Sequence, residues 1–218
     1  MIKMKSGVKR TTNLEQYTYA SIDVETLGLD ADKHKIVEVG VVLDNHLHRI
    51  DYSSINDYIK KLPCYHCYIR HDSYEGDPYA VEMNKDIIDI IESNASLCII
   101  NEDQLAASLD MFFTRHLLSN GKPVKIMPAG KNFGGFDKQF LIKIPKVKEI
   151  LDKWLIHRTL DPAMYFFDEN VDDRLPDLET CLQRANFYTG VKHTAPEDAY
   201  DLVRCLRYKW DYNPLKNM

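Results

Sequence analysis

The 218-residue sequence has no apolar run near the length of about 18 residues that a membrane-spanning helix needs, which disfavours an integral membrane protein. It also has no excess of basic residues. The formal net charge of −5 disfavours a protein that coats nucleic acid through a basic surface. An enzyme whose acidic site is neutralised by metal ions stays compatible with this charge. The basic N-terminus, residues 1–16, lacks the apolar core of a signal peptide, and we expect a flexible leader.

Cysteine is scarce too. The five cysteines, an odd number, are spread along the chain and indicate reduced thiols and a cytoplasmic protein. Cys64 and Cys67 have a zinc-like spacing with His71 nearby, but no second pair completes a four-ligand site. The chain also lacks internal repeats and low-complexity tracts. Its length suits one domain, which we place at residues 17–212, followed by a tail at 213–218.

Hydrophobic periodicity predicts an α/β protein in which a mixed five-stranded sheet is flanked by helices. Three successive strands near the N-terminus indicate an antiparallel meander, because Asp44-Asn45 makes a good turn between the second and third. The predicted strands are residues 17–25, 36–43, about 48–59, 124–129 and 158–161. The predicted helices are about 78–91, 101–117, 134–143, 147–156, 175–185 and 194–209.

The stretch 21–28 reads as a strand that runs into a turn. Side chains alternate faces along a strand, so Ile22 and Val24 point into a core while Asp23 and Glu25 share the other face. Two neighbouring carboxylates repel each other unless a cation lies between them, and Mg²⁺ or Mn²⁺ prefers such oxygen ligands. An exposed acidic strand face is the alternative, so this stretch needs further ligands from elsewhere in the chain.

Two later segments supply them. Asp137 follows Gly134-Gly135 in the first turns of a predicted helix, where a lone acidic residue would otherwise only complement the helix dipole. Asp198 lies about one turn into the last predicted helix. The start of that helix is well specified, since Thr194 and Glu197 have capping-box spacing and Pro196 suits the first turn.

His193 precedes this helix on the incoming loop, so an imidazole and the Asp198 carboxylate lie near the same helix end. A lone histidine at such a position is more often a surface residue. His193 becomes a candidate catalytic residue only when it is considered together with the other carboxylates.

Together these segments resemble the DEDD superfamily of 3′→5′ exonucleases, in its histidine branch. The first motif is Asp-x-Glu-Thr at residues 23–26, and the second is Asn-x-x-x-Phe-Asp at 132–137. The third is His-x-Ala-x-x-Asp-Ala at 193–199. The tyrosine branch is disfavoured because Thr194 occupies the position four residues before Asp198. The resemblance implies a ribonuclease H-like fold and spans the chain from about residue 17 to 208.

The resemblance also implies two ions, Mg²⁺ or Mn²⁺, that clamp the attacking and leaving oxygens of an in-line displacement. His193 would take a proton from the attacking water, since histidine exchanges protons near neutral pH. The implied metal ligands are Asp23, Glu25, Asp137 and Asp198.

Four further residues are implied to contact substrate. Thr26 and Leu27 would seat the 3′-terminal nucleotide, with Leu27 wedged against a base; turn and core are the alternative roles. Asn132 and Phe133 lie where family members often touch the strand, and stacking on Phe133 would tolerate any base. A core position for Phe133 is an equal alternative.

The predicted activity is hydrolysis of single-stranded nucleic acid from its 3′ end to nucleoside 5′-monophosphates, with DNA favoured. An exoribonuclease or oligoribonuclease of the same family is the first alternative, because composition does not separate DNA from RNA. A non-catalytic nucleic-acid-binding module on this fold is the second, and the complete ligand set disfavours it. A single domain without polymerase motifs indicates a stand-alone nuclease or a proofreading subunit, whose partner would be a polymerase or a replication or repair complex.

Overall fold

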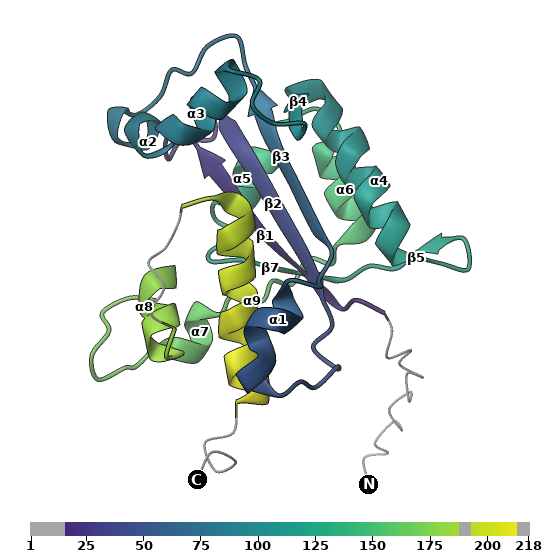
Figure 1. Ribbon diagram of the computed structural model, residues 1–218, viewed down its shortest axis with the longest axis vertical. Helices are drawn as coiled ribbons and strands as arrows, with labels where there is room; N and C mark the ends of the chain where they lie inside the picture. The colour runs from purple at the N-terminus through teal and green to yellow at the C-terminus, as the bar shows by residue number, and fades with distance from the viewer. Residues whose placement is uncertain (1–15, 188–192, 213–218) are drawn as a thin grey trace, which may run out of the picture.

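A computed structural model describes residues 16–187 and 193–212, and a five-stranded sheet forms its centre (Figure 1). The strand order is β4-β3-β2-β1-β7. The pairs β1–β2 and β2–β3 are antiparallel, whereas β1–β7 and β3–β4 are parallel, so the predicted mixed sheet with three antiparallel leading strands is confirmed. The strands are β1 (Tyr19–Thr26), β2 (Ile36–Asp44), β3 (Cys64–Arg70), β4 (Ile99–Asn101) and β7 (Met127–Ala129).

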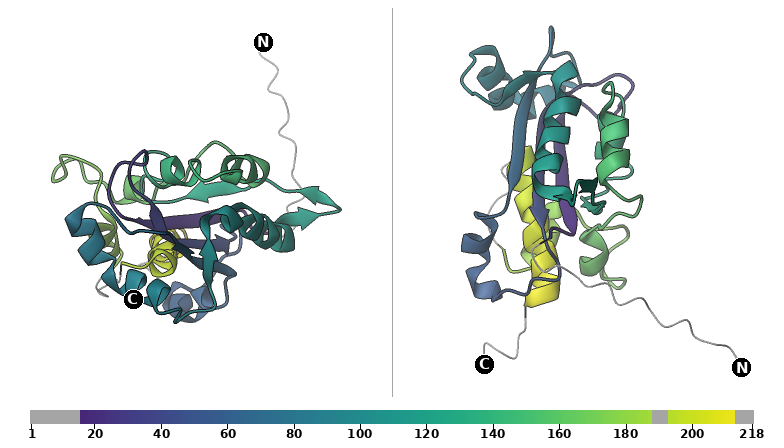
Figure 2. Two further views of the ribbon diagram at one scale, coloured as in Figure 1. Left: turned by 90° about the horizontal axis from the view of Figure 1, so that it is seen from above. Right: turned by 90° about the vertical axis from the view of Figure 1, so that its right-hand side faces the viewer.

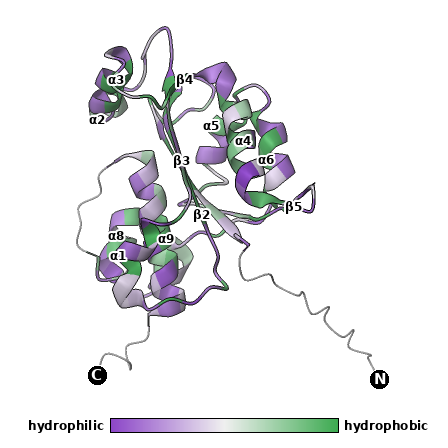
Figure 3. Cartoon of the chain, turned by 45° about the vertical axis from the view of Figure 1, so that its right-hand side comes forward, coloured by the Kyte–Doolittle hydropathy of each residue, from purple (hydrophilic) through white to green (hydrophobic). Residues whose placement is uncertain are grey.

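Helices cover both faces of this sheet (Figures 2 and 3). One face carries α4 (Leu105–Leu117), α5 (Asp137–Leu141) and α6 (Val147–Trp154). The other carries α9 (Ala195–Asp211), flanked by α1 (Ile55–Ile59) and α8 (Leu178–Arg184). The short helix α7 (Ala163–Phe166) packs beside α8. Helices α2 (Pro78–Met83) and α3 (Lys85–Glu92) lie at the end of the sheet where β1 ends.

The alternation of side chains along β1 decides what each face contains. Ile22 and Val24 are buried in the main core with residues of α4 and α6. Tyr19 belongs to a second core cluster with residues of α9. Asp23 and Glu25 have the same parity as Tyr19, so they face α9. The predicted division of β1 into an apolar and an acidic face is therefore confirmed.

The third predicted strand was wrong. Residues 48–59 contain the 3₁₀ helix η1 (Tyr52–Ser54) and α1, and the third strand is β3, in a segment to which no strand was assigned. Asp51 starts the helical turn by accepting a hydrogen bond from the Ser53 amide. Ile55 and Ile59, one turn apart, then pack into the core beneath α9. Short helices with few apolar residues are hard to separate from strands by periodicity.

The fifth predicted strand was also wrong. Residues 158–161 contribute only a single bridge between Leu160 and Ala129. The fifth strand is instead the three-residue β4, at the opposite edge of the sheet. Asn120 and Gly121, just after the predicted helix 101–117, form the turn of a small hairpin between β5 (Leu118–Ser119) and β6 (Lys122–Pro123).

The other predicted helices exist with shifted ends. Asp77 caps α2 by accepting from the Tyr79 amide, and Pro78 follows it in the first turn. The helix expected over 78–91 is divided at Asn84 into α2 and α3. Asn101 and Gln104 form a capping box ahead of the 3₁₀ helix η2 (Glu102–Gln104), which leads into α4.

The far end of α9 is joined to β2 by buried charged groups. The Arg207 guanidinium donates to both carboxylate oxygens of Asp44, at 2.8 and 2.6 Å, and both side chains are fully buried. Tyr19 and Tyr58 donate their hydroxyls to the same carboxylate, at 2.5 and 2.6 Å. This network fixes the C-terminal half of α9 to the end of the sheet.

Within residues 16–187 and 193–212, no helix has the length and apolar character to span a bilayer. The predicted leader at 1–16 and the tail at 213–218 lie outside the described residues, apart from Gln16.

Candidate active site

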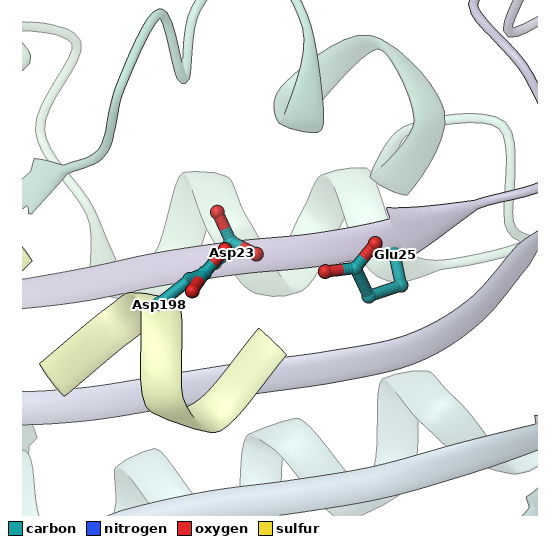
Figure 4. A group of neighbouring side chains, drawn as sticks. All are labelled: Asp23, Glu25 and Asp198. Carbon is teal, nitrogen blue, oxygen red and sulfur yellow. The ribbon is translucent and has the colours of Figure 1, made fainter. Parts of the chain in front are cut away.

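Three carboxylates meet between β1 and α9. Asp23 and Glu25 extend from β1, and Asp198 extends toward them from α9 (Figure 4). One oxygen from each of the three lies within 4.8 Å of the others. In the described part of the chain, no other group of three or more histidine, cysteine or acidic side chains comes together in this way. Alternation along β1 explains the first two, and the packing of α9 on β1 and β2 brings the third.

Asp137 lies beside this group but outside its 4.8 Å radius. It begins α5, and its Oδ1 accepts a hydrogen bond from the Val24 amide at 3.1 Å. The side chain is buried, and its charge is among those that raise the pKa of Asp23. The structure therefore places all four predicted carboxylates in one region, three of them within reach of a single ion.

The electrostatics of the group are unfavourable without a cation. Burial, together with the charges of Asp198, Glu38 and Asp137, raises the pKa of Glu25 to about 8. Burial also raises the pKa of Asp137 to about 7 and, with nearby acidic groups, that of Asp198 to about 7. For Asp23, burial and then the neighbouring carboxylates raise the pKa well above its usual value.

The residues present fit a divalent cation. The Asp198 Oδ1 atom is buried and has no hydrogen-bond partner, an arrangement that is costly unless something positive is bound there. Hard cations such as Mg²⁺ and Mn²⁺ take carboxylate oxygens as ligands. A bound cation would satisfy this oxygen and offset the repulsion within the group.

The first turn of α9 is attached directly to the sheet. The predicted capping role of Thr194 is only partly realised: Thr194 is the N-cap residue, but its side chain makes no capping hydrogen bond. The Ala195 amide instead donates to Oε2 of Glu38 on β2, at 2.8 Å. Ser21 on β1 donates its hydroxyl to the Ala199 carbonyl, also at 2.8 Å. These contacts flank Asp198 on both sides.

His193 stands immediately before the N-cap of α9, as expected. Its side chain is exposed, and its backbone has a φ of 49°, in the left-handed region. It belongs to the described chain, whereas residues 188–192 just before it do not. The imidazole is thus at the helix end that carries Asp198, on the solvent side.

In the loop after β1, the position of Leu27 differs from the expected contact with a base. Leu27 is fully buried among residues of β2 and α3, so its side chain offers no surface to a base. Leu29, two residues later, is 85% exposed. Thr26 is buried, and its hydroxyl donates to the Gly28 carbonyl at 2.8 Å, which stabilises the turn.

The second predicted contact region, Asn132 and Phe133, also has one exposed and one buried residue. Asn132 is exposed in a left-handed conformation (φ 55°), and its backbone N–H donates to Oδ2 of Asp161 at 2.9 Å. Phe133 is 2% exposed and packs in the main core, so its ring offers no face for stacking. Asn132 thus remains available to a ligand, whereas Phe133 takes the core role that was its alternative.

Three residues of the site were missed by sequence reasoning. Glu38 and Gly40 lie in a β-branched run that reads as a buried strand, and Ser21 precedes the first motif. Strand pairing is what places Glu38 and Gly40 at the site. In the β1–β2 pair, Glu38 is opposite Glu25 and Gly40 is opposite Asp23, on the acidic face. The register of that pair, which a single sequence does not specify, was needed to see it.

The fold is similar to that of several solved structures, among them E. coli exonuclease I. E. coli exonuclease I in its zinc-bound complex with single-stranded DNA matches with a TM-score of 0.55 and 18% identity, and the match covers 88% of this chain and 40% of that one. The same enzyme with a dA16 oligonucleotide matches at 0.56 and 17%, with the same coverage. S. pombe Pop2p in its Mg²⁺- and Mn²⁺-bound form matches at 0.59 and 14%, over 88% of this chain and 82% of that one.

These likenesses show a ribonuclease H-like α/β fold, in agreement with the sequence prediction. The chain spans about 40% of the length of exonuclease I. No protein-family model matches the sequence, and no curated protein sequence matches it significantly.

Proposed function

We propose that the protein is a metal-dependent 3′→5′ exonuclease of the DEDD superfamily, histidine branch, acting on single-stranded nucleic acid. One observation carries the proposal. Asp23, Glu25 and Asp198, from the first and third motifs of that superfamily, converge within 4.8 Å, and Asp198 has a buried oxygen without a partner. The fold shared with exonuclease I and Pop2p supports it.

The proposed ligands of two ions, Mg²⁺ or Mn²⁺, are Asp23, Glu25, Asp137 and Asp198. Such ions polarise a phosphodiester and lower the pKa of water. The chain contributes one half-buried and three buried carboxylates, on strands and helices that pack on one another. Asp137 is oriented by the Val24 amide, so that β1 and α5 keep a fixed spacing around the site.

His193 is the proposed general base. Its exposed position lets the imidazole reach a water at the edge of the acidic group and pass the proton to solvent. The left-handed backbone at His193 turns the chain sharply into α9, so the side chain stays close to the helix end that carries Asp198.

The 3′-terminal nucleotide is proposed to lie over the turn that follows β1. The backbone at Thr26 supports it, and Leu29 supplies the apolar contact that the sequence had assigned to Leu27. Asn132, which is exposed, is proposed as a further contact to the strand. DNA is the favoured substrate, and an exoribonuclease is the alternative within the same mechanism.

A labelled oligonucleotide tests the proposal. A 5′-labelled single-stranded DNA and its RNA counterpart are incubated with the protein and Mg²⁺ or Mn²⁺, with and without excess EDTA. We expect a ladder that shortens from the 3′ end, 5′-monophosphate products and no cleavage in EDTA. Absence of cleavage of both strands under both metals would favour a non-catalytic binding module.

A further inference from the structure

Glu38 is a fifth carboxylate at the acidic group, outside the superfamily motifs identified above. It lies on β2 directly opposite Glu25 of β1, and its side chain is fully buried. Its charge is among those that raise the pKa of Asp23, Glu25 and Asp198. A buried carboxylate beside three others is unfavourable unless its oxygens are well satisfied.

Both oxygens of Glu38 are satisfied, by two different parts of the fold. Oε1 lies 2.7 Å from Nε2 of His66 on the neighbouring strand β3. Oε2 accepts the hydrogen bond of the Ala195 amide at 2.8 Å. Ala195 is the first residue of α9, so Glu38 takes the role that a capping side chain usually has, from another element 157 residues away in the sequence.

The backbones of β2 and α9 lie very close together at this contact. A Cβ atom on Gly40 would lie 2.4 Å from the backbone carbon and oxygen of Ala195, so the first turn of α9 rests on β2 itself. Ser21 holds the Ala199 carbonyl from β1. Asp198 thus lies between two anchored points, one on each strand.

We infer that Glu38 is a positioning residue, held by His66, which anchors the first amide of α9 and so fixes Asp198 against Asp23 and Glu25. The inference rests on the proposed metal site. Glu38 is not itself assigned as a metal ligand, because both of its oxygens already have partners within the protein. Residues that orient metal ligands in this way typically contribute about 10–100-fold to metal affinity.

Two variants separate anchoring from charge. Glu38→Gln and Glu38→Ala both remove the negative charge, but the glutamine carbonyl still accepts from the Ala195 amide. We expect Glu38→Ala to bind Mn²⁺ about 10–100-fold more weakly in a titration of free Mn²⁺ by electron paramagnetic resonance. Glu38→Gln should stay within about threefold of the wild type, and His66→Ala should lie between the two. Glu149→Ala, which removes an exposed carboxylate on α6, is the matched control.

Hydrogen exchange supplies a local readout. In ¹⁵N-labelled protein we expect the Ala195 amide to exchange faster in Glu38→Ala but not in Glu38→Gln. The amides of α4, on the other face of the sheet, should keep their protection, which shows that the protein remains folded. Should Glu38→Ala not fold, Glu38→Asp keeps the charge on a shorter side chain, and weakened Mn²⁺ binding is again expected.

The inference is overturned if Glu38→Ala binds Mn²⁺ within twofold of the wild type. Equal weakening by Glu38→Ala and Glu38→Gln also overturns it, because charge alone would then explain the effect. Neither readout requires cleavage. A wild-type protein that binds Mn²⁺ but cuts no oligonucleotide would therefore contradict the proposed function and leave the role of Glu38 to be decided by these measurements.

Discussion

Glu25 and Glu38 lie directly opposite each other in the antiparallel pair of β1 and β2, both buried. Like charges in this arrangement destabilise a sheet. The two residues differ in their partners: Glu38 has His66 and the Ala195 amide, while Glu25 belongs to the group that fits a cation. Glu38 is thus satisfied by partners within the protein, whereas Glu25 is available to a ligand.

Replacing Asp198 by asparagine should separate activity from stability. We expect cleavage to fall at least about 100-fold, because a metal ligand contributes several kcal/mol and each tenfold corresponds to about 1.4 kcal/mol. The metal-free variant should melt at a higher temperature than the wild type at pH 8, since one repelling carboxylate is gone. Initial rates and thermal melting measure the two effects. A variant of unchanged activity would contradict the assignment of Asp198 as a ligand.

The stability of the metal-free protein should fall as the pH rises. Folding raises the pKa of Glu25 from 4.5 to about 8 and that of Asp198 from 3.8 to about 7, so the folded state binds protons more tightly than the unfolded state. This contribution is complete below about pH 4 and is lost as the pH passes through 7 and 8. Each pKa unit that persists in solution corresponds to about 1.4 kcal/mol, or about 3–5 °C in a domain of this size.

Calorimetric melting between pH 5 and 8, in EDTA, measures this fall. Saturating Mg²⁺ should abolish it, because the ion binds the ionised carboxylates of the folded state. A metal-free melting temperature that stays level or rises over this range would argue against the repulsion described for the acidic group.

Replacing His193 should slow cleavage while sparing metal binding. We choose His193→Asn, because asparagine tolerates the left-handed backbone at this position. The loss of a general base typically costs about 10²–10⁴-fold in rate. Mn²⁺ titration should give the wild-type affinity, and His157→Asn, which changes another exposed histidine, should cleave normally. Wild-type rates for His193→Asn would remove this residue from the mechanism.

Truncation of Leu29 should weaken substrate binding, whereas truncation of Leu27 should lower stability. Leu29→Ala removes an exposed apolar contact, and we expect KM for the oligonucleotide to rise about 5–30-fold, equivalent to about 1–2 kcal/mol, with an unchanged melting temperature. Leu27→Ala leaves a cavity in the core and should cost about 2–5 kcal/mol of stability. Steady-state kinetics and denaturant unfolding distinguish them. A raised KM in Leu27→Ala alone would restore the original assignment.

Breaking the Asp44–Arg207 pair should affect stability alone. Asp44→Ala leaves the buried Arg207 guanidinium without its main partner, which typically costs about 3–5 kcal/mol. Mn²⁺ affinity should change less than twofold. The exposed pair of Lys85 and Asp89 is the comparison: Asp89→Ala should cost less than about 1 kcal/mol. Similar losses in the two variants would show that the buried network adds little.

Much of this site could be predicted because its determinants are local. Strand alternation alone placed Asp23 and Glu25 on one face, opposite the core residues Ile22 and Val24. The start of α9 followed from the cap position of Thr194 and the proline in the first turn, which set Asp198 one turn in.

The remainder depended on contacts that are distant in the sequence. Residues 48–59 were misassigned because burial against α9, rather than periodicity, makes Ile55 and Ile59 helical. The exposure of Leu29 and the burial of Leu27 follow from how the turn meets α3. The role of Glu38 depends on the strand register and on where α9 packs against β2, and tertiary contacts set both.

The strand β2 holds α9 at both ends, through Glu38 at the first turn and through Asp44 at Arg207. The helix and the strand should therefore open together, as one cooperative unit. A cation bound at the acidic end would then slow amide exchange around Arg207, at the opposite end of α9. A bound cation would therefore stabilise the whole of α9, and its removal would speed amide exchange as far away as Arg207.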